Sequence, residues 1–347
     1  MKKTVTRLAD GRELVYYDSR DDAVRDAVDH RPLGPVATTS EIRHDVLLGD
    51  SIAIASHRQD RTYHPPADEC PLCPSRDGRL SEIPEPDYDV VVFENRFPSL
   101  AGDAGRCEVV CFTSDHDTSF SQIGEEQAGM VLEVWTDRTA ELAELPQVEQ
   151  VFPFENRGAE IGVTLGHPHG QIYAYPFATP RATLMLRSAR DHRAGTGRNL
   201  FDDIVERERT EGTRVVLEGE HWVAFVPYAA HWPYEVHLYP KRRVRDLRGL
   251  DDAARTEFPQ IYLELLKRFD RIFGEGEPPT PYIAAWHQAP FRAEGRDEFA
   301  LHLELFTIRR TSGKLKFLAG SESGMSVFIN DVPPEAAAER LREVASE

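Results

Sequence analysis

The chain has 347 residues, of which 40% are hydrophobic and 29% are charged, as in a soluble globular protein with room for a sizeable core. Aspartate and glutamate number 59 against 41 lysines and arginines, so the formal net charge is −18. This acidity disfavours nucleic-acid and membrane-surface partners, because like charges repel, yet a few arginines in one cleft still permit a small phosphorylated substrate.

Residues 1–40 are polar and weakly patterned, which predicts an N-terminal arm with one short helix around Asp21–Asp29. The first residues lack the apolar segment of a signal peptide, and the chain has no run of 18 apolar residues. We therefore expect a cytoplasmic protein without a membrane partner. Residues 62–88 are rich in proline, aspartate and serine, which predicts a loop that carries Cys70 and Cys73.

Strand-like and helix-like patterns alternate through the rest of the first half. Apolar and aromatic runs predict strands at Val90–Phe93, Val109–Phe112, Val151–Phe154 and Ile161–Leu165. Apolar residues at helical spacing predict a helix from Glu125 to about Glu144. The polar, glycine-containing residues 187–200 predict a flexible crossover.

The second half repeats this order of elements. The expected strands are Trp222–Pro227, Glu235–Tyr239, Ile283–Trp286 and Leu301–Ile308, and the expected helices are Asp251–Phe273 and Pro334–Val344. The repetition predicts an α+β fold of two tandem halves, mostly antiparallel sheet with flanking helices. We place the first half at 41–186 and the second at 201–347.

The segment from Glu155 to Gln171, ENRGAEIGVTLGHPHGQ, concentrates the chemistry. Side chains of an extended chain alternate, so His167, His169 and Gln171 are expected on one side. A neutral imidazole is a competent nucleophile toward phosphorus, which makes His169 the predicted carrier of a nucleotidyl group. Gln171 is the expected donor to phosphoryl oxygens, with further donors from Asn156 and Thr164. The competing interpretation is a core or metal-binding histidine pair.

In a cytosolic chain, the Cys-x-x-Cys pair indicates metal binding or redox chemistry before it indicates a disulfide. With His116 and His167, Cys70 and Cys73 would complete a closed tetrahedral zinc site, although spacing alone makes only the cysteine pair specific. A zinc ion bound by His167 would be structural, because it would fix the segment that carries His169. The other interpretation of His116 is a surface residue.

The second cysteine pair and the two arginines of SHRQDR indicate function less specifically. Cys107 and Cys111 are assigned to core packing. Arg58 and Arg61 form either a solvated charge run or a pair of bidentate phosphate ligands.

From about Glu41 to Val344 the chain resembles the galactose-1-phosphate uridylyltransferase family, a branch of the histidine-triad superfamily. HPHGQ with ENRG upstream is the most specific match. The further matching segments, in the same order, are SHRQDR, CPLC, VFENRFPSL, VVCFTSDH, HWVAFVPYAAHWPYEVHLYPKRRV, WHQAPF and EAAAERLREV. The resemblance implies two histidine-triad-like halves.

The resemblance also implies a ping-pong reaction in galactose metabolism. His169 would attack the α-phosphorus of UDP-glucose, release glucose 1-phosphate, and pass the uridylyl group to galactose 1-phosphate. The carbonyl of His167 would hold the other nitrogen of His169, and Gln171 would contact the phosphoryl oxygens.

The resemblance assigns further residues to substrate binding. Phosphate- and sugar-contacting positions would be Arg58, Arg61, Asn156, Thr164 and Lys316, and Asn95 and Phe97 would lie near the uridine. A homodimer is implied, in which each site is completed by the neighbouring subunit.

The chain departs from the family pattern at a second metal site, which in the family uses one glutamate and three histidines. His287 and His302 match, Glu304 replaces the third histidine, and an apolar residue near Met185 replaces the glutamate. A His₂Glu set for iron or zinc remains one interpretation, and buried hydrogen-bonded histidines are the other. The segment from Lys316 to Asp331 also differs, with Glu322 as the retained candidate hexose contact.

Three alternatives remain. One is a related nucleotidyltransferase, such as an ADP-glucose phosphorylase with inorganic phosphate as acceptor. Another is a histidine-triad nucleotide hydrolase, in which a histidine is expected at the position of Gln171. The last is a non-enzymatic, zinc-stabilised nucleotide-binding protein.

Overall fold

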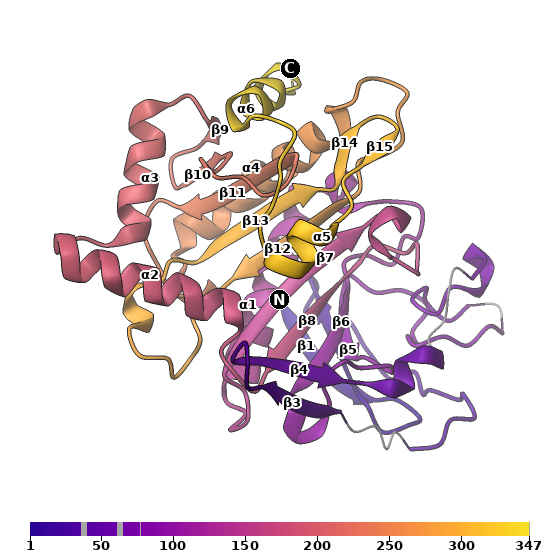
Figure 1. Ribbon diagram of the computed structural model, residues 1–347. Coiled ribbons are helices and arrows are strands. Elements are labelled where there is room, and N and C mark those ends of the chain that lie inside the picture. The colour runs from indigo at the N-terminus through magenta and orange to yellow at the C-terminus, as the bar shows by residue number, and fades with distance from the viewer. Residues whose placement is uncertain (36–39, 61–64, 77, 347) are drawn as a thin grey trace. The chain divides into compact units, whose positions relative to one another are not determined.

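The computed structural model describes residues 1–35, 40–60, 65–76 and 78–346 of the chain (Figure 1). The chain divides into two compact units. Unit 1 contains Met1–Pro153, Thr164–Thr183 and Pro290–Ala293, and unit 2 contains Phe154–Val163, Leu184–Ala289 and Glu294–Glu347.

Unit 1 contains an antiparallel sheet in which β8 pairs with β6. The order is β1-β2-β5-β6-β8, formed by β1 (Lys2–Arg7), β2 (Glu13–Asp18), β5 (Val90–Glu94), β6 (Arg106–Cys111) and β8 (His169–Tyr175). A separate hairpin consists of β3 (Glu41–Asp45) and β4 (Asp50–Ile54). The helix α1 (Glu125–Ala143) buries an apolar side that includes Val131, Val134 and Trp135.

Unit 2 contains antiparallel sheet strands in the order β7-β12-β13-β11-β10-β9. Its strands are β7 (Gln150–Arg157, paired through residues 154–157), β9 (Val215–Glu218), β10 (Trp222–Phe225), β11 (Tyr234–Pro240), β12 (Tyr282–His287) and β13 (His302–Thr307). A small hairpin, β14 (Arg309–Thr311) and β15 (Lys314–Leu315), follows.

The helices of unit 2 are α2 (Pro180–Thr196, its first residues in unit 1), α3 (Leu200–Glu211), α4 (Asp252–Arg271), α5 (Gly320–Met325) and α6 (Pro334–Glu343). Of these, α4 and α6 pack on the sheet strands of the unit. Figure 1 shows α6 beside β9, and α4 contacts both. Phe258 of α4 lies 5.4 Å from the ring centroids of both Trp222 and Trp286, which are fully buried. Antiparallel sheets with flanking helices confirm the predicted α+β class.

The expectation for the N-terminal residues is wrong in two respects. Residues 2–18 contribute two strands to the sheet of unit 1, because Leu14–Tyr17 are buried and pair with β5. Residues 21–29 are not helical. Asp29 instead accepts hydrogen bonds from the main-chain N–H groups of Ala9 and Arg31, at 2.9 and 3.1 Å, which competes with helix formation.

Two later expectations are also wrong. The predicted strand Ile161–Leu165 is a short 3₁₀ turn, η5 (Ala159–Ile161), followed by irregular chain. Gly158 and Gly162 adopt φ values of 108° and 83° there, which a strand does not accommodate. Residues 187–196 of the expected flexible crossover belong to α2, and Asn199 caps α3 by accepting from the N–H groups of Phe201 and Asp202.

Candidate active site and metal-binding clusters

His169 is the first residue of β8, and the main chain holds its ring. Its Nδ1 lies 2.7 Å from the carbonyl oxygen of His167. Because a carbonyl only accepts, Nδ1 carries the hydrogen and Nε2 carries the free lone pair. Burial lowers the pKa of His169, which favours the neutral ring at neutral pH. The geometry leaves Nε2 able to act as a nucleophile.

The side chains of β8 alternate between the core and a partly exposed face. Gly170, Ile172 and Ala174 are buried, and the partly exposed side chains are those of His169, Gln171, Tyr173 and Tyr175. His169 and Gln171 therefore lie on one face of the strand, as alternation predicts. His167 precedes the strand, and its ring is buried in a different environment.

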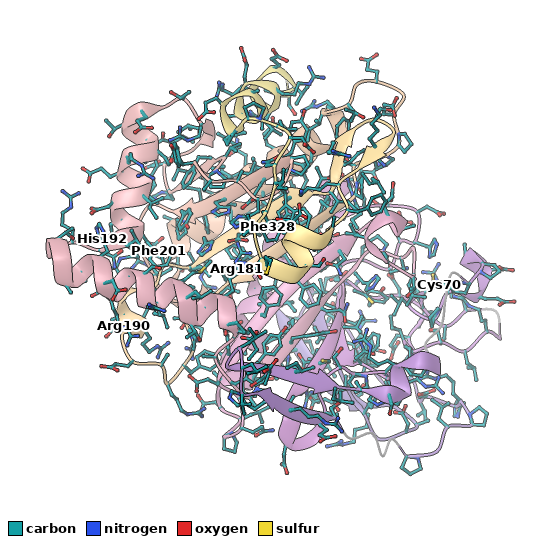
Figure 2. The ribbon with its side chains drawn as sticks, viewed as in Figure 1. Cys70, Arg181, Arg190, His192, Phe201 and Phe328 are labelled. Atoms are coloured by element: carbon teal, nitrogen blue, oxygen red, sulfur yellow. The ribbon has the colours of Figure 1, made fainter. Side chains whose placement is uncertain are left out.

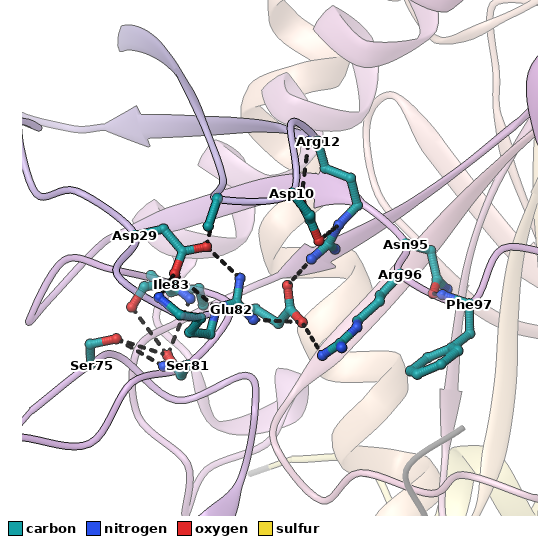
Figure 3. A network of polar contacts seen from close by, with 12 residues as sticks. Asp10, Arg12, Asp29, Ser75, Ser81, Glu82, Ile83, Asn95, Arg96 and Phe97 are labelled. Atoms are coloured by element: carbon teal, nitrogen blue, oxygen red, sulfur yellow. Dashed lines mark hydrogen bonds and ion pairs between the residues drawn. The ribbon is translucent and has the colours of Figure 1, made fainter. Parts of the chain in front are cut away.

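Asn95 lies directly beside Gln171. Its Nδ2 donates to Oε1 of Gln171 at 3.4 Å, and its own Oδ1 accepts from the N–H of Phe97 at 2.8 Å. Figure 3 shows Asn95 and Phe97 at the end of the chain segment that follows β5. With Oε1 occupied, the NH₂ group of Gln171 is the side-chain donor on the face that carries His169.

Arg58 also reaches this face of β8. Its guanidinium donates to the hydroxyl of Tyr173 at 3.3 Å, and that hydroxyl lies 3.0 Å from Oγ of Ser99. Arg58 thus places a positive charge beside Tyr173, which lies four residues after His169 on the same face of β8. The second predicted arginine, Arg61, lies outside the described residues. Thr164 is partly buried in unit 1.

The predicted metal ligands of unit 1 come together. The donor atoms of Cys70, Cys73, His116 and His167 all lie within 4.8 Å of one another, and we call these four residues the Cys–His cluster. Cys73 Sγ is 3.2 Å from Nδ1 of His116 and 3.5 Å from Nδ1 of His167. All four cysteines of the chain are free thiols, and Cys107 and Cys111 are buried, as expected for core packing. Figure 2 marks Cys70 in its loop.

His167 joins the Cys–His cluster to His169. Its Nε2 donates to the carbonyl of Thr113 at 2.8 Å, which leaves Nδ1 as the acceptor that faces Cys73. The hydroxyl of Tyr88 lies 2.9 Å from the same Nε2. Burial lowers the pKa of His167 to about 4, so the ring is neutral, as a metal ligand requires. Its side chain thus faces the cluster while its carbonyl orients His169.

A buried polar network fixes the loop that contains Cys73 (Figure 3). Ser81 donates to the carbonyl of Cys73 at 2.5 Å and contacts Oγ of Ser75 at 3.3 Å. The next residue, Glu82, forms ion pairs with Arg12 and Arg31 at 2.5 and 2.8 Å. These charge-assisted contacts hold Glu82 against Arg12, which directly precedes β2, and against Arg31.

In unit 2, Lys316 and Glu322 form a buried ion pair. Lys316 Nζ lies 2.8 Å from Oε1 of Glu322 and also donates to the carbonyl of Ile329. The other carboxylate oxygen accepts from the N–H of Ala319 at the start of α5, at 3.2 Å. The hydrogen bond from Lys316 lowers the pKa of Glu322 to about 2. Asn156 lies elsewhere in the unit, in β7, paired with Ile283.

A second triad of candidate ligands lies in the sheet of unit 2. His287 Nε2 is 3.3 Å from one carboxylate oxygen of Glu304, and His302 Nε2 is 3.5 Å from the other. His287 and His302 are direct partners across β12 and β13. All three residues are buried, and their donor atoms lie within 4.8 Å of one another.

Comparison with known proteins identifies the family. Residues 101–179 match the model of the galactose-1-phosphate uridyl transferase N-terminal domain, and residues 185–347 match that of the C-terminal domain. The chain is 70% identical to a galactose-1-phosphate uridylyltransferase from Streptomyces lividans over 99% of this chain and 98% of that protein. The chain belongs to the galactose-1-phosphate uridylyltransferase family.

More distant members of this family span most of the chain too. A galactose-1-phosphate uridylyltransferase from Thermotoga maritima is 37% identical over 88% of this chain and 99% of its own length. A solved structure described as a uridylyltransferase superposes with a TM-score of 0.76 at 31% identity, covering 88% of this chain and 98% of that one. Among the described residues of this family member, no helix is both long and apolar enough to cross a membrane.

Sequence analysis missed several residues that surround these sites. Tyr88 and Thr113 contact His167, and Tyr173 contacts Arg58. Tyr173 had a usable signal, because it lies two and four residues after Gln171 and His169 on one strand face. Tyr88 and Thr113 had none, because their contacts depend on how the loops of this family member fold.

Proposed function

We propose that the chain is a UDP-glucose–hexose-1-phosphate uridylyltransferase that works through a covalent uridylyl-His169 intermediate. The observation that carries the proposal is the hydrogen bond from Nδ1 of His169 to the carbonyl of His167, which leaves Nε2 as the nucleophile. Nε2 forms a bond to the α-phosphorus of UDP-glucose as the bond to the glucose 1-phosphate oxygen breaks. A phosphate oxygen of galactose 1-phosphate then attacks the same phosphorus, releasing UDP-galactose and free His169.

Gln171 is proposed to stabilise the charge that develops on the α-phosphoryl oxygens. Its NH₂ group donates from the strand face of His169, and Asn95 orients it. An amide cannot exchange a proton as an imidazole can, so Gln171 cannot serve as a general acid or base for hydrolysis. The uridylyl-His169 intermediate is therefore expected to persist until a phosphate-bearing acceptor arrives.

Further substrate contacts are proposed from the family resemblance. Arg58 and Arg61 would bind phosphate, and Asn95 and Phe97 would lie near the uridine. Asn156, Thr164, Lys316 and Glu322 would complete the phosphate and hexose contacts. A homodimer, in which the neighbouring subunit completes each site, is part of the same proposal.

We also propose zinc as the ion of the Cys–His cluster. Two thiolates and two imidazoles suit tetrahedral zinc, and the donor atoms already lie within 4.8 Å of one another. Burial raises the pKa of the Cys70 thiol to about 11, so a bound cation would be needed to ionise it at neutral pH. Zinc there would be structural. A second divalent cation, iron or zinc, is proposed at the second triad.

The decisive experiment is the intact mass of the full-length protein after mixing with UDP-glucose alone. We expect the wild type to gain one uridylyl group and to lose it when galactose 1-phosphate is added. His169→Asn should show no adduct, whereas a matched control at the exposed His44, His44→Asn, should label like the wild type.

Two other outcomes would overturn parts of the proposal. An adduct formed with ADP-glucose but not with UDP-glucose, and discharged by inorganic phosphate, would indicate a phosphorylase. No adduct with either nucleotide sugar would exclude the covalent mechanism and favour a hydrolase or a nucleotide-binding protein.

A further inference from the structure

Tyr173, on the strand face that carries His169, contacts Arg58 through its hydroxyl. The guanidinium of Arg58 donates to that hydroxyl at 3.3 Å, and the hydroxyl lies 3.0 Å from Oγ of Ser99. Because a guanidinium has no acceptor, the phenol oxygen accepts from Arg58, and its own proton is available for Ser99. The side chains of Arg58, Tyr173 and Ser99 therefore form one series of hydrogen bonds.

The chain segment 95–99, which follows β5, supports this face of β8 at two points. Asn95 donates to the side chain of Gln171 at 3.4 Å. Ser99 contacts Tyr173, which lies two residues further along β8 and on the same face. One segment of unit 1 thus holds both the amide that is proposed to contact the phosphoryl oxygens and the phenol that contacts Arg58.

The same segment anchors the 3₁₀ turn η1 (Ser56–Asp60), which carries Arg58. Nε2 of His57 lies 2.7 Å from the carbonyl oxygen of Pro98, and because a carbonyl only accepts, the ring donates to it. The turn is therefore attached through His57, while the far end of the Arg58 side chain is attached separately through Tyr173.

The partner of Arg58 is a neutral hydroxyl, which preserves the charge of the guanidinium. Burial raises the pKa of Tyr173 above its ordinary value, so the phenol remains protonated at neutral pH. A carboxylate in this place would compensate the cation before any substrate binds, and among the side chains that the structure describes no carboxylate pairs with Arg58. The bond to Tyr173 uses one N–H and leaves the others for a bidentate contact with phosphoryl oxygens.

We propose that Tyr173 is the positioning residue of Arg58, with Ser99 orienting the Tyr173 hydroxyl. The phenol holds the guanidinium in one orientation without neutralising it. A long arginine side chain that is ordered in advance loses less conformational entropy when it binds a phosphoryl group, so more of the interaction contributes to the reaction. The inference rests on the uridylyl transfer proposed above, and it adds a residue that acts through another side chain.

A double-mutant cycle on the rate at which UDP-glucose labels His169 tests this inference. The intact mass of the full-length protein is followed in time, at UDP-glucose concentrations below saturation. We expect Arg58→Met to slow labelling about 100-fold, through lost charge-assisted hydrogen bonds, and Tyr173→Phe to slow it about tenfold. Because Tyr173 acts only through Arg58, the double variant should be no slower than Arg58→Met alone.

Two further variants serve as controls. Tyr175→Phe removes a hydroxyl two residues further along the same face of β8 and should label at the wild-type rate. Ser99→Ala should slow labelling only about threefold, because the Tyr173 hydroxyl keeps its contact with Arg58 but loses the partner that orients it. An unchanged far-UV circular dichroism spectrum would show that each variant is folded.

Three results would overturn the proposal. Labelling of Tyr173→Phe as fast as Tyr175→Phe would mean that Arg58 needs no positioning. Equal slowing by Tyr173→Phe with and without Arg58 would mean that the phenol acts independently of the arginine. Labelling of Arg58→Met at the wild-type rate would mean that Arg58 does not bind phosphate. All three differ from failure of the transferase mechanism, in which the wild type itself gains no uridylyl group.

Discussion

The Cys–His cluster and the second triad assemble their donor atoms in different ways. Cys70 and Cys73 come from one loop, and His116 and His167 are supplied by chain segments next to strands, so the cluster ties irregular segments together. In the second triad every member lies on β12 or β13, and strand pairing sets the neighbours. A cation is therefore expected to organise the first cluster, whereas the second is organised by the sheet before any cation binds.

Removal of a ligand from the Cys–His cluster should have the largest effect. We expect Cys73→Ala to lose zinc, to lower the free energy of unfolding by about 3–5 kcal/mol, as for a buried charge that has lost its partner, and to slow uridylylation of His169 by more than about tenfold. Zinc analysis, thermal denaturation and the rate of adduct formation from UDP-glucose measure these effects.

A matched substitution in the second triad tests the contrast. His287→Gln should lose the second cation but leave the zinc of the Cys–His cluster and the far-UV circular dichroism spectrum unchanged, because strand pairing persists. The contrast fails if Cys73→Ala and His287→Gln lower the unfolding temperature equally.

A second test concerns Glu155, a buried carboxyl of unit 2 that lies outside both clusters. Its side-chain contact is a hydrogen bond from the hydroxyl of Tyr282 at 2.9 Å, and burial raises its pKa to about 7. A carboxyl whose pKa is raised on folding binds its proton more tightly in the folded state. Ionisation of Glu155 therefore lowers the free energy of unfolding increasingly as the pH rises from about 4.5 to about 7.

Glu155→Gln should remove this pH dependence. The free energy of unfolding of the variant, relative to the wild type, should rise by about 2.5 kcal/mol between pH 5 and pH 8. Urea denaturation across that range measures the difference. A constant difference at all pH values would mean that Glu155 is ionised in the folded protein at pH 5, as the better-compensated Glu304 is expected to be.

The smallest expected effect concerns the support of His167. Tyr88→Phe removes the hydroxyl beside Nε2 of His167 but keeps the ring and the bond from Nε2 to the carbonyl of Thr113. We expect about 1 kcal/mol of lost stability and an approximately tenfold weaker affinity for zinc. Zinc competition with a chromophoric chelator measures the latter. An unchanged affinity would mean that Thr113 alone orients the ring.

How much the sequence predicts depends on whether the signal is local. The helices α1, α4 and α6 and most strands follow from apolar periodicity, and HPHGQ and Cys-x-x-Cys single out His169 and the cysteine pair. β2 was missed because Leu14–Tyr17 are buried on both faces and show no alternation. β1 was missed because its sequence, KKTVTR, is mostly polar and none of its residues is buried. The second half of α2 was missed because its exposed side is polar throughout.

The contact between His237 and Glu304 was missed for a different reason. Nothing in VHLYP distinguishes a histidine that faces a buried carboxylate from one on a solvated strand. Glu304 is 67 residues away in sequence and becomes the neighbour of His237 only through the register of β11 and β13. The substitution of histidine by Glu304 could be recognised from the sequence, but the neighbours of Glu304 required the sheet.

The group that orients His169 is a main-chain carbonyl, and this has a mutational consequence. Every amino acid at position 167 retains that oxygen, so no single substitution can delete the acceptor itself. A replacement at this position can only displace it, by releasing the side chain from Cys73, Tyr88 and Thr113. The Nδ1-protonated tautomer of His169 would therefore be lost through substitutions that displace the backbone at position 167. Variants with residual activity are expected at the residues whose side chains hold this segment.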